Sequence, residues 1–211
     1  MSFDSDLRRG FWRVLVGTGL LAVASCSAVS IVETARYTLP PVELEPATHR
    51  IPYVLRISDF EVAPHLQTEH LQTQFEDARI VVRASESWSA PLGSLVTNSI
   101  LSGLLESERF RAVVDDHEAA RAQLVLRGRV EGFEEWRDGG TRQAAVTVGF
   151  VLSGEDRGEI LLQKRVEAKV PLQREDGATL VRGLHRALGD AFRIFLASAE
   201  ETAGAWSAPD R

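Results

Sequence analysis

The sequence predicts an α+β fold, a mostly antiparallel sheet with two amphipathic helices packed on one face. Two long segments repeat apolar residues at spacings of three and four, which is typical of helices. Several other segments alternate apolar and polar residues, which is typical of strands. Glycine-containing turns join the strands in the second half of the chain. The expected order of elements is β-β-α-β-β-β-β-α.

The first predicted strands cover residues 53–62 and 78–84. Tyr53, Leu55 and Ile57 alternate with polar or smaller side chains, and β-branched and aromatic residues favour an extended backbone. Residues 65–77 between the two strands are polar and show no sustained period. The sequence therefore predicts a loop for this stretch.

Two helices are predicted, and the first follows the sequence Ser87-Trp88-Ser89-Ala90-Pro91-Leu92. Ser89 is the expected N-cap, since proline is tolerated in the first helical turn. This helix should run to about Glu106, and the last helix should cover 177–199. Their apolar stripes consist of Leu92, Val96, Ile100 and Leu104 in the first, and of Val181, Leu184, Leu188, Ala191 and Phe195 in the second.

Four further strands are predicted between the helices, at 110–114, 123–136, 143–152 and 159–170. The second and third of these are joined by Arg137-Asp138-Gly139-Gly140. Asp-Gly between alternating segments indicates a hairpin, because glycine accepts the positive φ of the turn. A second turn is expected at 153–158, so the last three strands form an antiparallel meander.

Cys26 is the only cysteine of the chain and ends an export-type leader. Arg8, Arg9 and Arg13 precede an apolar segment over 14–24, and Val-Ala-Ser stands directly before the cysteine. The apolar segment has about half of the ~20 residues that a membrane-spanning helix needs. This pattern resembles a bacterial lipobox, in which the leader is cleaved and the cysteine thiol is acylated with fatty acids such as palmitate. An uncleaved membrane anchor, or the first helix of a cytosolic domain, is the alternative.

Four segments follow from this interpretation: a signal peptide over 1–25, a lipidated cysteine and tether over 26–50, a domain over 51–200 and a flexible tail over 201–211. Pro40, Pro41 and Pro46 favour an extended tether. Tyr37-Thr38-Leu39 within it could instead pack on the domain as a short strand. Acidic Asp4 and Asp6 in the basic region leave the true translation start open.

Composition excludes several classes of function. The chain of 211 residues has a formal net charge of −6, and the first 25 residues carry +1, which leaves −7 on the remaining 186. An acidic chain without a basic cluster predicts no nucleic-acid partner. A single cysteine excludes an intramolecular disulfide, cysteine-based zinc sites and, once acylated, thiolate catalysis.

The search for catalytic groups predicts no enzyme, no cofactor and no metal site. The sequence contains no G-x-S-x-G or Ser-x-x-Lys pattern and no phosphate-binding loop. His65 and His70, with Glu69, are the candidate metal ligands of the sequence, but their spacing of five does not match a helical ligand pair. The acidic pair Glu134-Glu135 is expected to be solvated. Trp136, close to the hairpin, is a candidate partner contact because tryptophan is enriched at interface hot spots.

In combination, several motifs resemble the ABC-type transport auxiliary lipoproteins, the PqiC-like family that accompanies MCE-domain lipid transport systems. The resemblance covers nearly the whole mature chain, although residues 64–69 depart from the family's usual sequence. Its motifs are the lipobox, Tyr37-Thr38-Leu39-Pro40, the strand over 53–62 with the loop over 64–71, the helix start over 87–92, Val130-Glu131-Gly132-Phe133-Glu134 and the final helix.

The resemblance implies a non-catalytic lipoprotein that works beside an MCE-domain protein and its inner-membrane permease and ATPase. The expected location is the periplasmic face of the outer membrane, since Ser27 follows the cysteine, with the inner membrane possible. The resemblance also implies a homo-oligomer and a phospholipid cargo carried between the two membranes. A regulator of a periplasmic cell-wall synthase is the alternative, and a hydrolase is disfavoured for lack of a nucleophile–base pair.

Overall fold

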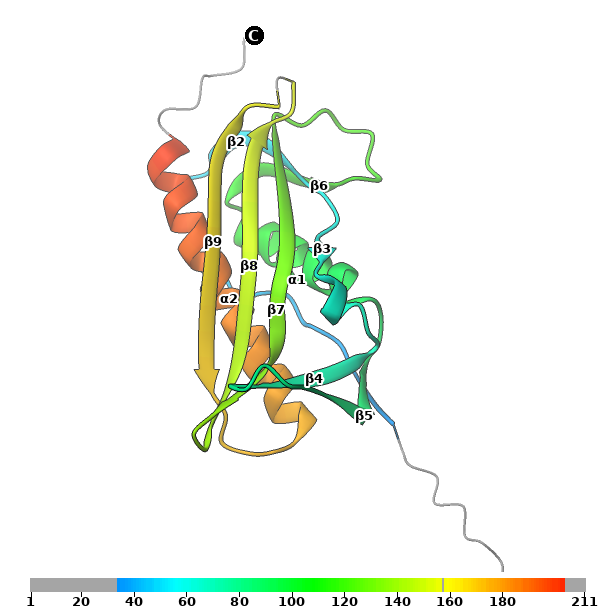
Figure 1. Cartoon of the computed structure of the whole chain (residues 1–211). Coiled ribbons are helices and arrows are strands. Elements are labelled where there is room, and N and C mark those ends of the chain that lie inside the picture. Colours follow the sequence, from blue (N-terminus) through cyan, green and yellow to red (C-terminus); the bar gives the residue numbers. More distant parts are fainter. Residues whose placement is uncertain (1–33, 157, 204–211) are drawn as a thin grey trace, which may run out of the picture. The chain divides into compact units, whose positions relative to one another are not determined.

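The computed structural model describes residues 34–156 and 158–203, so Cys26 and the predicted leader lie outside the described residues. The described residues form twelve regular elements, and Figure 1 shows their arrangement. Their bounds are β1 Ala35–Tyr37, β2 Ile51–Ile57, β3 Glu61–Val62, the 3₁₀ helix η1 Pro64–Leu66, β4 His70–Phe75, β5 Ile80–Trp88, α1 Leu92–Ser107, β6 Phe110–Asp115, β7 Leu124–Asp138, β8 Thr141–Gly154, β9 Ile160–Pro171 and α2 Gly177–Ala203.

The fold is α+β as predicted, but the sheet is mixed, which corrects the prediction of a mostly antiparallel one. Of the strand pairings in the described residues, five are parallel and three are antiparallel. The antiparallel pairs are hairpins of neighbouring strands. Each parallel pair joins strands that are distant in sequence, and alternation within one strand does not report its partner. The prediction of antiparallel pairing was therefore wrong for the strands whose partners are distant in sequence.

Strand β7 organises the sheet. Along one edge it pairs with β8 over its whole length. Along its other edge it pairs in turn with β2, β3 and β4, all parallel to it. The chain from β2 to β4 therefore follows β7 from its start to its end. After β5, helix α1 leads back to β6, which pairs with β2 near the start of β7. The β7–β8 turn has Gly139 at φ 50° and Gly140 at φ 89°, so the predicted glycine-dependent hairpin is confirmed.

Both helices lie behind β7, β8 and β9 in Figure 1, and one hydrophobic core joins them to the sheet. An aromatic cluster lies at the centre of this core. Phe150 of β8 stacks on Phe195 of α2 with ring centroids 4.8 Å apart, and Phe192 and Phe60 lie within 5.7 and 6.0 Å. The two helical stripes predicted from spacing therefore pack on one core, as expected.

The segment predicted as a tether, 26–50, packs on the domain in its described part. Val42 is 1% exposed, and its N–H donates to the carbonyl of Ser99 on α1 at 3.0 Å. Gly103 of α1 allows this contact, since a Cβ there would lie 2.4 Å from the Val42 carbonyl oxygen. The domain in the structure thus includes residues well before 51, and Tyr37 belongs to strand β1.

Residues 65–77 are not a loop throughout, which corrects a second expectation. They contain β4, whose Gln72 and Thr73 are buried. Both side chains form hydrogen bonds: Gln72 Nε2 donates to the carbonyl of His65 at 2.9 Å, and Thr73 Oγ1 donates to Glu135 at 3.1 Å. Buried polar side chains remove the apolar alternation by which a strand is recognised.

Candidate functional site

An open pocket of about 500 Å³ lies at the N-terminal end of α1. Its lining combines apolar side chains with a smaller polar set, and it comes from four separate segments of the chain. The apolar lining consists of Val62, Leu66, Trp88, Ala90, Pro91 and Leu92, and the remainder of Arg36, Gln67, Thr68, Glu69, Ser89 and Gly93. Residues 66–69 and the start of α1 over 88–93 therefore meet at one place.

Backbone hydrogen bonds hold these segments together. The N–H of Trp88 donates to the carbonyl of Glu69 at 2.6 Å, and the N–H of Ser89 donates to the carbonyl of Tyr37 at 2.8 Å. Trp88 is 6% exposed and packs edge-to-face on Phe133 with ring centroids 5.7 Å apart. The indole is thus a fixed wall of the pocket, as expected for an aromatic side chain that anchors the start of a helix.

The N-terminus of α1 opens into the pocket. The N-cap is Pro91, with φ −51° and ψ 134°, and no side chain caps the first turn, so the expectation of Ser89 as N-cap is wrong. Gly93 brings the helix close to the loop between β2 and β3, because a Cβ there would lie 2.5 Å from the carbonyl oxygen of Phe60. A larger residue would push this end of α1 away from the pocket wall.

The chemistry of this lining is that of a binding surface. Among the lining residues there is no histidine or cysteine. Apolar walls with a few polar groups at the rim are typical of sites that take an apolar group and orient it.

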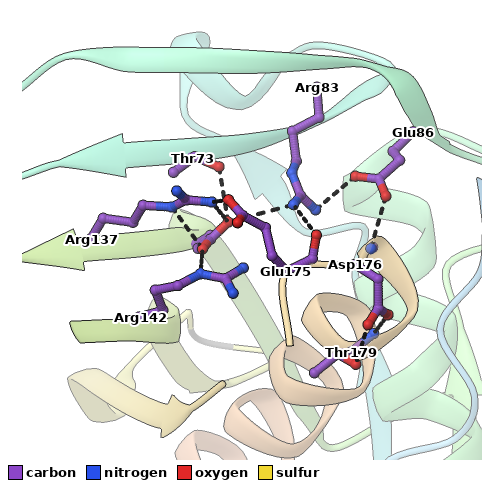
Figure 2. A network of polar contacts seen from close by, with 10 residues as sticks. Thr73, Arg83, Glu86, Arg137, Arg142, Glu175, Asp176 and Thr179 are labelled. Atoms are coloured by element: carbon purple, nitrogen blue, oxygen red, sulfur yellow. Dashed lines mark hydrogen bonds and ion pairs between the residues drawn. The ribbon is translucent and has the colours of Figure 1, made fainter. Parts of the chain in front are cut away.

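A second polar feature is a buried ionic cluster around Glu135, shown in Figure 2. The Glu135 side chain is fully buried. Arg142 Nε and Arg137 Nε donate to its Oε1 at 2.6 and 2.9 Å, and Thr73 Oγ1 donates to Oε2 at 3.1 Å. A third cation, Arg83, has its Nη2 at 3.7 Å from Oε2. Burial opposes the ionisation of Glu135, but the bonds from Arg142 and Arg137 outweigh it and lower its pKa.

This cluster continues to the start of α2. Arg137 pairs with Glu175, and Arg83 pairs with Glu86 at 2.7 Å. Glu86 in turn accepts the N–H of Gly177 at 2.8 Å, while Asp176 accepts the N–H of Thr179 at 2.7 Å as the helix cap. Through these contacts the cluster joins β4, β5, β7 and β8 to α2.

Glu134, next to Glu135 in β7, is also buried, so the expectation that this pair is solvated is wrong. Glu134 is 7% exposed. Desolvation raises its pKa to about 7, although the hydrogen bond from the Phe133 N–H acts in the opposite direction. The register shift in β7 between Val130 and Gly132 lies just before these two residues.

Stability should fall as the pH rises through the range in which Glu134 ionises. The folded state keeps its proton up to about pH 7, while the unfolded state loses it near pH 4.3, so ionisation favours unfolding between these values. Glu134→Gln has no such ionisation. The difference in the free energy of unfolding between Glu134→Gln and the parent should therefore shift by about 2 kcal/mol in favour of the variant from pH 5 to pH 8. Urea unfolding across this range measures the gain.

The matched control is Glu61→Gln, since the Glu61 side chain is 76% exposed. Its pH profile should run parallel to that of the parent. Parallel profiles for Glu134→Gln as well would contradict the raised pKa.

Of the candidate site residues predicted from the sequence, Trp136, His65 and His70 do not line the pocket, whereas Glu69 does. Trp136 is half-buried on β7, with Lys169 Nζ 5.3 Å from its ring centroid, and does not line the pocket. His65 and His70 belong to no metal-type cluster: over residues 34–156 and 158–203, no group of three His, Cys, Asp or Glu residues is placed to hold a metal ion. Within the same residues no helix has the length and apolarity to cross a membrane. The pocket itself escaped prediction, because Arg36 and residues 66–69 carry no sequence signal of binding.

Comparisons with known proteins identify the family. The family model described as ABC-type transport auxiliary lipoprotein component matches residues 37–193. No curated protein matches this sequence. A crystal structure of a Xanthomonas campestris protein has the same fold, with a TM-score of 0.70 at 16% identity over 81% of this chain and 97% of the other. A Chlamydia trachomatis protein matches with a TM-score of 0.52 at 12% identity, over 74% and 99%.

Proposed function

Because this chain belongs to the family of ABC-type transport auxiliary lipoprotein components, we propose that it serves an MCE-type lipid transport system as a non-catalytic envelope component. The proposal rests on the family match together with one structural observation. The helix start over 87–92 carries part of the resemblance. It lines the pocket at α1 together with residues 66–69, where this sequence departs from the family's usual one. A pocket built by these segments suits the docking of a partner better than it suits catalysis.

We further propose that Cys26 carries the lipid anchor after removal of residues 1–25. The predicted tail over 201–211 begins later than expected, since α2 continues to Ala203. The proposed location is the periplasmic face of the outer membrane. Two or more acyl chains on one cysteine give stable anchoring, whereas a single chain gives only marginal binding. This anchor holds the domain where a conduit for phospholipid between the membranes would end.

The proposed occupant of the pocket is an apolar side chain of the MCE-domain partner. About 500 Å³ is room for a bulky side chain with its neighbours, and the polar rim could fix the backbone of the partner segment. Trp136 remains a second proposed contact, since its side chain is only half-buried. A homo-oligomer is also proposed, in which copies surround the end of the conduit.

Ala90→Arg tests the pocket. Ala90 is exposed at the rim, so the substitution should leave the fold intact while it places a charge where an apolar group would dock. We expect recovery of the MCE-domain protein from detergent-solubilised envelopes to fall about tenfold, as for a lost hot-spot contact. Quantitative mass spectrometry of the co-purified proteins measures it.

Ala119→Arg is the matched control, because Ala119 is exposed, lies outside the pocket and changes charge equally. It should keep the parent's recovery. If the parent itself recovers no MCE-domain protein, the proposed function is wrong. If Ala90→Arg recovers as much as Ala119→Arg, the pocket is not the docking site.

A further inference from the structure

Three consecutive apolar side chains lie exposed on β5. Ile80, Val81 and Val82 are 39%, 42% and 47% exposed. Successive side chains of a strand point to opposite faces, so this part of β5 is open to solvent on both faces. Exposed apolar residues that are contiguous in space mark an interaction surface, whereas single ones need no explanation.

The outer edge of the same stretch is also open. β4 pairs with one edge of β5 from Ile80 to Ser87. On the other edge β1 pairs only with residues Glu86 to Trp88. Among the strands of the described residues, none covers this edge beside Ile80–Val82. An edge with free backbone groups needs water, lipid headgroups or another strand as its partner.

The position at which the chain enters the domain favours a lipid bilayer as the partner of this edge. β1 is parallel to β5, with Ala35 opposite Glu86, so the chain enters the sheet from the side of the open stretch. Val82 lies four residues before Glu86, about 13 Å along the strand. Cys26 stands nine residues before Ala35 and can be no farther from it than about 30 Å. A bilayer that holds this cysteine is therefore within reach of the open stretch.

The charges around the stretch suit a lipid surface without strong charge. Arg79 pairs with Asp77 at 3.6 Å, and Arg83 pairs with Glu86 at 2.7 Å. Matched ion pairs and a net charge of −7 on residues 26–211, from −6 minus +1, give no attraction to an anionic surface. Apolar side chains flanked by neutralised pairs fit the interface of a zwitterionic phospholipid bilayer.

We propose that Ile80, Val81 and Val82 form the membrane-contacting surface of the domain, and that this edge of β5 rests in the headgroup region of the bilayer that holds the anchor. The inference rests on the lipidation of Cys26 in the proposed function. The docked orientation directs the other end of the sheet, with β2 and β6, away from the lipid surface (Figure 1).

Site-specific labelling of the full-length lipidated protein tests this orientation. Since Cys26 is the only cysteine and is blocked by lipid, Val82→Cys offers one free thiol for an environment-sensitive fluorophore. Ile160→Cys, at the start of β9 and 59% exposed, is the control. In phosphatidylcholine vesicles we expect nitroxide-bearing lipid to quench the Val82 label by about half or more and iodide to quench it little. The Ile160 label should show the reverse.

Each other outcome overturns the inference. A Val82 label that iodide quenches as strongly as the control faces water. A label protected from both quenchers is covered by protein, either a second copy or another segment of this chain. A mass that shows no acyl chain on Cys26 removes the premise. These vesicles contain no transport partner, and Ala90→Arg should not change the quenching, so failure here is distinct from failure of partner binding.

Discussion

Glu135→Ala is expected to lower the free energy of unfolding by about 3–5 kcal/mol. The carboxylate is fully buried and accepts hydrogen bonds from Arg142, Arg137 and Thr73. Its removal leaves these arginines without the charge that compensates their burial. Truncating one partner of a buried ionic cluster costs more than the cluster itself contributes, because the remaining charges stay desolvated. Urea unfolding at pH 7 measures the loss.

Two comparisons separate this effect from a general loss of charge. Glu61→Ala removes an ion pair with Arg129 at 3.6 Å, in which both side chains are mostly exposed, and should cost less than about 1 kcal/mol. Glu175→Ala removes an outer member of the cluster, whose side chain is 64% exposed. It should likewise cost far less than Glu135→Ala. Equal losses at Glu61 and Glu135 would show that burial is not the cause.

Phe150→Ala is expected to cost about 3–5 kcal/mol. Phe150 is fully buried on β8, and its ring contacts Phe195 and Phe192 of α2 and Phe60 of the loop between β2 and β3. The truncation opens a cavity at the point where α2 packs on the sheet. The surrounding rings are held by the backbone and can fill the cavity only in part. Thermal and urea unfolding measure the cost, and loss of near-ultraviolet circular dichroism reports loosened aromatic packing.

Phe150→Leu keeps most of the apolar volume and should cost about 1 kcal/mol. Ile194→Ala, on the same helix as Phe192 and Phe195 but 46% exposed, should change stability by less than about 1 kcal/mol. A cost of Phe150→Ala near that of Ile194→Ala would contradict the assignment of these rings as the centre of the core.

Local patterns predicted the elements that depend on neighbouring residues. The stripe from Leu92 to Leu104 predicted α1, and Asp138-Gly139-Gly140 predicted the β7–β8 hairpin, because both signals lie within one element or one turn. Strand β4 escaped prediction, since its Gln72 and Thr73 are buried through hydrogen bonds rather than apolar contacts. The same reason explains why Glu134 and Glu135 were expected in solvent.

The candidate site could be predicted only in part. Trp88, Pro91 and Leu92 stood out in the sequence, and the structure places them in the pocket. Arg36 and Glu69 belong to segments that had been interpreted as tether and loop. They reach the pocket through hydrogen bonds of Tyr37 and Glu69 with the end of β5. These hydrogen bonds join residues 52 and 19 positions apart in the chain, and contacts over such distances leave no periodic trace in either segment.

By itself, the sequence determined the family, the two helices, the hairpin strands and the expectation of an acylated Cys26, because each depends on a short pattern of residue types. Only the tertiary structure decided the parallel pairing along β7, the buried Glu135 cluster, the pocket at α1 and the open edge of β5. These four features depend on which distant segments meet, and pairing over such distances is set by the packing of the whole domain rather than by local propensity.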